Sequence, residues 1–103
     1  MNAPEKPTPT DNLRLLPWTT PEGNPCYLST DSPHSRLSLI ADGIEAAQLA
    51  SGEQVLAGSR AVLADPNAGE RAVRFALTRA AESLGDALRI AVSRGERIPG
   101  SEL

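Results

Sequence analysis

The stretch that decides the fold runs from residue 32 to residue 67 and reads SPHSRLSLIADGIEAAQLASGEQVLAGSRAVLADPN. Its apolar residues recur every three or four positions, which is the spacing of an amphipathic helix. Asp31-Ser32-Pro33 is suited to start a helix, with Ser35 as a competing cap. Asp65-Pro66-Asn67 ends it, because proline disfavours a helical residue before it and cannot continue the helix. The pattern therefore predicts a helix over residues 32–64.

The residues that follow repeat the helical pattern, with one apolar and one charged side. This second helix is expected to run from about residue 68 to Arg94, and Gly95 suits the left-handed cap that ends many helices. Its apolar side is expected to comprise Val73, Ala76, Leu77, Ala80, Leu84, Ala87, Leu88 and Ala91. The sequence thus predicts an all-α fold class whose main unit is a two-helix antiparallel hairpin over residues 32–95.

Two apolar stripes follow the first helix, where one would cover a single neighbour. The first stripe comprises Leu37, Ile40, Ile44, Ala47, Ser51, Val55, Gly58 and Val62. The second stripe consists of Leu49, Leu56 and Leu63, which recur every seven residues. Because two stripes indicate two neighbours, we predict a homodimer in which paired hairpins form a four-helix bundle. The expected interface residues are Leu49, Leu56, Leu63, Ile44 and Val55.

The segment before the helices is expected to fold back onto them. Residues 13–31 form either a small β-hairpin around the turn Pro21-Glu22-Gly23-Asn24 or an irregular extended arm. In both cases the side chains expected to pack on the helices are those of Trp18, Tyr27 and Leu28. The alternative to the dimer is that the second leucine stripe merely seats Trp18 and Tyr27.

The two ends of the chain are expected to lie outside the folded part. Residues 1–12 contain three prolines and no large apolar residue after the initiator methionine, so we expect a disordered arm there. Residues 96–103 include Pro99 and Gly100, which is typical of a flexible tail.

Composition excludes several classes of partner. The net charge is −3, the arginines of the helices alternate with carboxylates, and the chain has only three aromatic residues, so direct nucleic-acid binding is not expected. No apolar run approaches the roughly 20 residues that span a bilayer, so no membrane partner is expected. A single cysteine, Cys26, rules out a disulfide within the chain, and no signal peptide is recognised, so we expect a cytoplasmic protein.

No motif indicates catalysis, cofactor binding or a metal centre. The single histidine, His34, and Cys26 lie in no recognisable nucleophile motif, and no cluster has zinc-ligand spacing. We therefore predict no catalytic, cofactor-binding or metal residues, and a non-enzymatic protein-interaction module. The alternative is a small-molecule-binding or enzymatic protein with a pocket between the segment from Trp18 to Leu28 and the helices.

A set of short motifs spans residues 13–97. They are Leu16-Pro17-Trp18, Pro21-Glu22-Gly23, the run PCYLSTD at residues 25–31, Ser35-Arg36-Leu37 and Arg94-Gly95. In these motifs the chain resembles a group of small actinobacterial proteins of unknown function, which are often encoded close to helix-turn-helix regulators of development and antibiotic production. The resemblance implies an accessory or regulatory protein that acts with a transcriptional regulator, and it supplies no active site.

Overall fold

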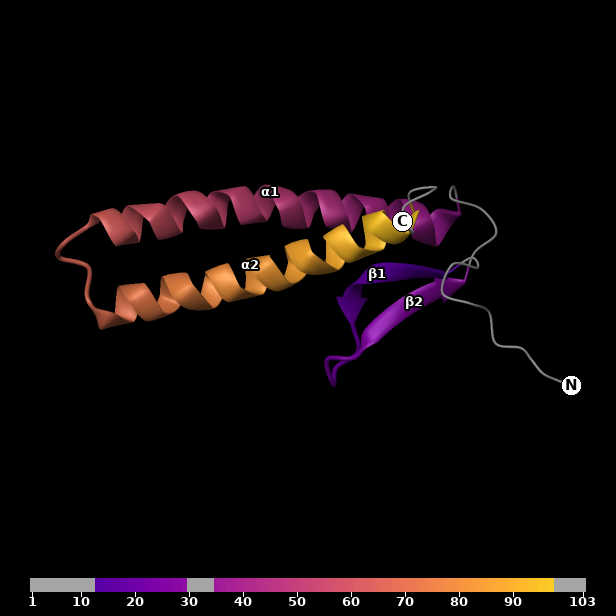
Figure 1. Cartoon of the computed structure of the whole chain (residues 1–103), viewed down its shortest axis with the longest axis horizontal. Coiled ribbons are helices and arrows are strands. Elements are labelled where there is room, and N and C mark those ends of the chain that lie inside the picture. Colours follow the sequence, from indigo (N-terminus) through magenta and orange to yellow (C-terminus); the bar gives the residue numbers. More distant parts are fainter. Residues whose placement is uncertain (1–12, 30–34, 98–103) are drawn as a thin grey trace, which may run out of the picture.

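Two long helices and a small β-hairpin make up the structure, a computed structural model that describes residues 13–29 and 35–97. The elements are β1 (Leu13–Thr19), β2 (Pro25–Ser29), α1 (Arg36–Ala64) and α2 (Glu70–Arg97). The helices run side by side in opposite directions, and the hairpin lies at their open end, away from the loop that joins them (Figure 1). This arrangement confirms the predicted helical hairpin and its N-terminal strand segment.

Helix α1 runs without interruption through Ser51-Gly52. Its N-cap is Ser35, whose hydroxyl accepts a hydrogen bond from the backbone N–H of Ser38 at 3.2 Å. The competing start at residues 31–33 lies outside the described residues. At the other end the backbone N–H of Asp65 donates to the carbonyl of Val62. The carboxylate of Asp65 then accepts from the N–H of Asn67 and completes the turn.

Helix α2 ends later than predicted. The expected end at Gly95 is wrong, because the helix continues through that residue to Arg97, so residues 96 and 97 do not belong to a tail. Gly95 does not adopt the left-handed conformation that the predicted cap requires. A glycine inside a helix costs only about 1 kcal/mol relative to alanine. The preceding turn is anchored by Ser93, which is buried against β1 and compensates for that cost.

The N-terminal segment forms a true β-hairpin rather than an irregular arm. Strands β1 and β2 are antiparallel, with Leu15 opposite Tyr27. The turn between them is closed by the carbonyl of Thr20, which accepts from the N–H of Gly23 at 2.8 Å. Gly23 has a φ of 89°, a conformation that suits glycine and few other residues. The turn signal in the sequence is therefore borne out at this position.

The helices hold the hairpin by one edge of β1. The hydroxyl of Ser93 in α2 donates to the carbonyl of Leu15, and the side-chain amide of Gln48 in α1 donates to the carbonyl of Pro17, both at 2.9 Å. Pro17 lies where the register shifts between Leu15 and Thr19, a bulge position that tolerates proline. These contacts explain how a two-stranded hairpin, marginal by itself, is stabilised.

The buried face of α1 differs from the predicted one. Ile40, in the first predicted stripe, is 48% exposed, and Leu37 and Ile44 are also exposed. In the first half of the helix the residues that point inward are small or polar: Ser38, Ala41, Glu45 and Gln48. In the second half, Ser51, Val55 and Val62 of the predicted stripe are half-buried as expected, together with Gly52 and Ser59. Two hydrogen bonds link this face to β1: Arg14 donates to the backbone carbonyl of Ser38, and the side-chain amide of Gln48 donates to that of Pro17.

The apolar core is small and lies at the open end. Of the described residues, four apolar ones are buried: Leu15, Leu16, Ala41 and Ile90. The large residues expected on the core side of α2 are instead exposed, namely Val73, Leu77, Leu84 and Leu88. The two helices meet through alanine, serine and glycine, so their leucines remain at the edges of the contact.

Candidate interaction surface

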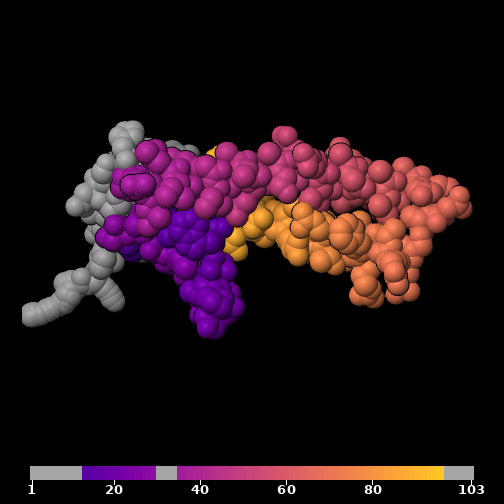
Figure 2. Space-filling view, turned by 180° about the vertical axis from the view of Figure 1, so that it is seen from behind, coloured from indigo at the N-terminus to yellow at the C-terminus, as the bar shows by residue number. Residues whose placement is uncertain are grey.

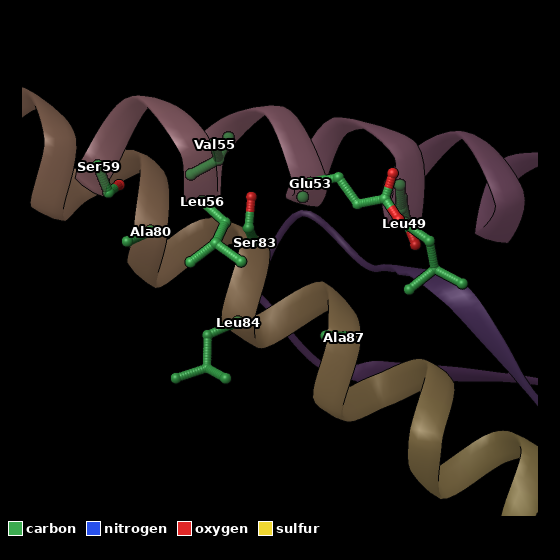
Figure 3. A pocket seen from close by; sticks show the side chains of 11 residues that line it. Leu49, Glu53, Val55, Leu56, Ser59, Ala80, Ser83, Leu84 and Ala87 are labelled. Carbon is green, nitrogen blue, oxygen red and sulfur yellow. The ribbon is translucent and has the colours of Figure 1, made fainter. Parts of the chain in front are cut away.

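An apolar groove runs between the helices along the middle of the hairpin (Figure 3). It has a volume of about 380 Å³. From α1 it is lined by Leu49, Val55 and Leu56, and from α2 by Ala80, Leu84 and Ala87, with a few polar residues at its margins. Leu56 is 51% exposed and Leu84 is 60% exposed, so the groove is open to solvent.

The groove belongs to a longer row of exposed apolar side chains on the same side of the hairpin. Leu63 lies seven residues after Leu56, and Leu77 lies seven residues before Leu84, so each pair shares one side of its helix. We call this surface the leucine face, defined by Leu49, Leu56, Leu63, Val73, Leu77, Leu84 and Leu88, all of which are exposed. Exposed apolar patches on soluble proteins mark protein–protein contacts, membrane contacts, ligand-binding grooves or sites of aggregation.

The leucine face brings together some of the predicted interface residues and leaves one apart. Leu49, Val55 and Leu56 line the groove. Leu63 extends the same side of α1 toward the loop. Ile44 lies five residues before Leu49, which is about 140° around the helix, and it does not line the groove.

The β-hairpin lies on the other side of the helices from the leucine face. Figure 3 shows the strands behind the two helices when the groove is viewed directly. Figure 2, which views the molecule from behind relative to Figure 1, shows the β-hairpin in front of the C-terminal part of α2. The leucines are therefore not covered by the hairpin, contrary to the alternative in which they seat Trp18 and Tyr27.

The side chains expected to hold the hairpin on the helices divide between two environments. Trp18 and Leu28 are half-buried. Tyr27 is instead 54% exposed, because neighbouring residues of a strand point to opposite faces and Leu28 takes the inner one. The side chains of Leu15 and Leu16 in β1 are more deeply buried than any of these three.

A buried ionic cluster joins β1 to both helices, and the sequence reasoning missed it. The guanidinium of Arg14 lies 2.7 Å from the carboxylate of Asp42 and 3.3 Å from that of Glu45. It also donates to the carbonyl of Ser38 at 3.0 Å. Arg94 of α2 reaches the same Glu45 carboxylate at 3.7 Å. Glu45 is only 1% exposed, so its charge is balanced by arginines of β1 and α2 rather than by water.

One signal in the sequence pointed to this cluster. Arg14 lies between Leu13 and Leu15 in an apolar strand, where a charged residue needs a buried partner. The geometry suits a structural role, because the cluster links three elements and borders none of the grooves described between the helices.

The remaining candidates for chemistry are few. Within residues 13–29 and 35–97, no group of three or more histidine, cysteine or acidic side chains is placed to hold a metal ion. Cys26 is a half-buried free thiol, and His34 lies outside the described residues. No helix in the described part has the length and apolarity needed to cross a membrane. The predicted pocket between the segment from Trp18 to Leu28 and the helices stays a prediction.

Comparisons of the chain with protein-family models, with curated proteins and with solved structures found no match.

Proposed function

We propose that the protein is a non-enzymatic interaction module that works as a homodimer. Its leucine face packs against the leucine face of a second copy, so that two hairpins form a four-helix bundle. The observation that supports this proposal is the exposure of seven leucine and valine side chains on one side of the hairpin, among them Leu77 at 68%. The bundle interior is where such residues lie in four-helix proteins.

The size of the core supports the same proposal. In the single chain, four apolar residues are buried in the described part, and one of them is the small Ala41. Burying a leucine side chain fully contributes about 1.5–3 kcal/mol. A chain of this length has little surface to bury and is marginally stable without such contributions. A second copy on the leucine face supplies a second core, at the end of the hairpin that has none.

A substitution at the centre of the leucine face tests the proposal. Leu56→Glu places a charge in the apolar contact, which costs several kcal/mol when the charge is desolvated and unpaired. Sedimentation equilibrium at micromolar concentration should show a dimer for the parent chain and a monomer for this variant. Circular dichroism should show reduced helicity for Leu56→Glu.

Arg71→Glu provides the matched control. The side chain of Arg71 is exposed and lies about 160° around α2 from Val73, outside the leucine face. Its loss should change stability by about 0.5 kcal/mol or less and leave the dimer intact. The milder variant Leu56→Ala, which adds no charge, should weaken the dimer without unfolding it. A monomeric parent chain, or a Leu56→Glu dimer as strong as the parent, would contradict the proposal.

We propose further that this dimer acts on a regulatory partner. The motifs around Trp18 and Tyr27, which resemble actinobacterial proteins encoded beside transcriptional regulators, support this role. The exposed ring of Tyr27 lies on the hairpin and leaves the leucine face free for dimerisation. Capture of a helix-turn-helix regulator by the parent chain but not by Tyr27→Ala is the expected result, and equal capture by both would count against a role for this residue.

A further inference from the structure

The leucine face has a symmetry of its own along α1. Its three leucines are spaced seven residues apart, so Leu49 and Leu63 lie at equal distances on either side of Leu56. A two-fold interface requires this property, because residue i of one copy must meet residue j of the other and the reverse. If a second α1 crosses antiparallel at Leu56, then Leu49 meets Leu63 of the second copy, and Leu63 meets Leu49.

The apolar row of α2 is symmetric in the same way. Leu77 and Leu84 lie at equal distances from the pair Ala80-Ala81, and so do Val73 and Leu88. The row therefore has large residues toward both ends and small residues at its centre. An antiparallel second α2 centred on Ala80-Ala81 brings Leu77 onto Leu84 and Val73 onto Leu88.

The two centres lie at the same level of the hairpin. A Cβ atom at Gly52 would lie 4.0 Å from the Cβ of Ser83, which sets the register between the antiparallel helices. Leu56 lies four residues after Gly52 in α1. Because the helices are antiparallel, it lies level with the residue four positions before Ser83 in α2, which is Arg79, next to Ala80. A single two-fold axis perpendicular to the helices can therefore pair the large residues of both rows at once.

Two charged residues of α1 flank the leucine face. Glu53 and Arg60 are exposed, flank Leu56 on the side of the leucine face, and have no ion-pair partner among the described residues. By contrast, six charged residues of α2 form three local pairs, as between Arg79 and Glu82 at 2.6 Å. Around a two-fold axis near Leu56, Glu53 of each copy lies opposite Arg60 of the other. The pair forms twice, once on each side of the axis.

We propose that the two copies pack antiparallel, α1 on α1 and α2 on α2, about a two-fold axis that crosses Leu56 and Ala80-Ala81. This inference rests on the proposed function, since it specifies the geometry of the same dimer. A parallel α1 pair would instead bring Glu53 onto Glu53. At the end that carries the β-hairpin, Asp42 and Arg94 bound the proposed interface. Both residues belong to the ionic cluster.

Single cysteines on the chain with Cys26→Ser test the geometry directly. Leu56→Cys lies on the axis, so a short bis-maleimide should link two copies efficiently. Leu49→Cys lies seven residues from the axis, which separates the two thiols by about 21 Å along the helices, so it should not link to itself. A mixture of Leu49→Cys and Leu63→Cys chains should link to each other.

Charge exchange tests the same geometry without cysteines. Glu53→Arg and Arg60→Glu each bring like charges together twice in the dimer, so each should weaken dimerisation about tenfold at low salt. An equimolar mixture of the two variants restores both pairs and should dimerise to within about threefold of the parent. Arg71→Glu, exposed and outside the leucine face, is the control that should leave the dimer unchanged.

The outcomes separate the geometry from the function on which it rests. A parent chain that sediments as a monomer overturns both proposals. A parent dimer in which Leu49→Cys links to itself, or Leu56→Cys does not, overturns only the antiparallel geometry. A parent dimer in which Glu53→Arg and Arg60→Glu dimerise as well as the parent overturns the charge pairing and leaves the interaction module standing.

Discussion

At the scale of single residues, Arg14 and Glu45 determine where the strand and the helices meet. The carboxylate of Glu45 is almost completely buried, and arginines from two other elements surround it. A buried carboxylate without such partners costs several kcal/mol. The strand therefore cannot slide along α1 without separating Arg14 from Glu45, and the ionic cluster fixes the position of the hairpin.

Removing one member of this cluster should be worse than removing two. Arg14→Met leaves the buried Glu45 with Arg94 at 3.7 Å as its arginine partner, and we expect a loss of about 3 kcal/mol in the free energy of unfolding. Arg14→Met with Glu45→Met removes both charges and should lose clearly less. Urea denaturation at one fixed protein concentration measures both. A double variant less stable than the single one would show that the ion pair itself stabilises the fold.

Some of these residues could be placed correctly from the sequence and others could not. The turn at Gly23 could be predicted because its chemistry is local. Strand alternation could have shown that Tyr27 and Leu28 do not both face the helices, but not that Tyr27 is the exposed one. The burial of Glu45 could not, because it depends on Arg14, which is distant in the sequence and is brought close only by the fold.

At the scale of elements, the sequence predicted the two helices well and their buried faces poorly. Length, caps and the stop at Pro66 are local signals, and α1 and α2 follow them apart from the last turn of α2. The inward face of α1 was misassigned because apolar periodicity assumes that the most apolar side is buried in the same chain. Here the stripe predicted to face the core begins with Leu37, Ile40 and Ile44, and the single chain leaves these three residues exposed.

Two glycines should respond in opposite ways to the same substitution. Gly43 lies inside α1 with open space around it, so Gly43→Ala should stabilise the protein by about 0.5–1 kcal/mol through helix propensity. Gly23 also has open space, but its φ of 89° strains any other side chain, so Gly23→Ala should destabilise by about 1 kcal/mol. Thermal unfolding of both variants measures the difference. A stabilising Gly23→Ala would show that the turn relaxes to another conformation.

At the scale of the whole molecule, the chain divides into a packed end, which carries the β-hairpin, and a loop end without such a core. The β-hairpin, the ionic cluster and the buried residues Leu15, Leu16 and Ile90 all lie at one end of the helices. The other end, near the loop, has the leucine face and a contact of small residues. Because the helices continue well beyond the packed end, their loop half exposes apolar side chains, which a second copy covers in the proposed bundle.

This division predicts how stability depends on concentration. If folding of the loop half is coupled to dimerisation, the folded state gains stability by mass action as the chain becomes more concentrated. A hundredfold rise in concentration favours the dimer by about 2.7 kcal/mol, which should raise the thermal midpoint by roughly 5 °C or more. Leu56→Glu should have a lower midpoint that does not change with concentration. Differential scanning fluorimetry with an extrinsic dye, or circular dichroism from micromolar to hundred-micromolar concentration, gives the comparison. A parent midpoint that stays constant across this range would mean that the exposed leucines do not contribute to folding, and that the single chain is stable with its leucine face in water.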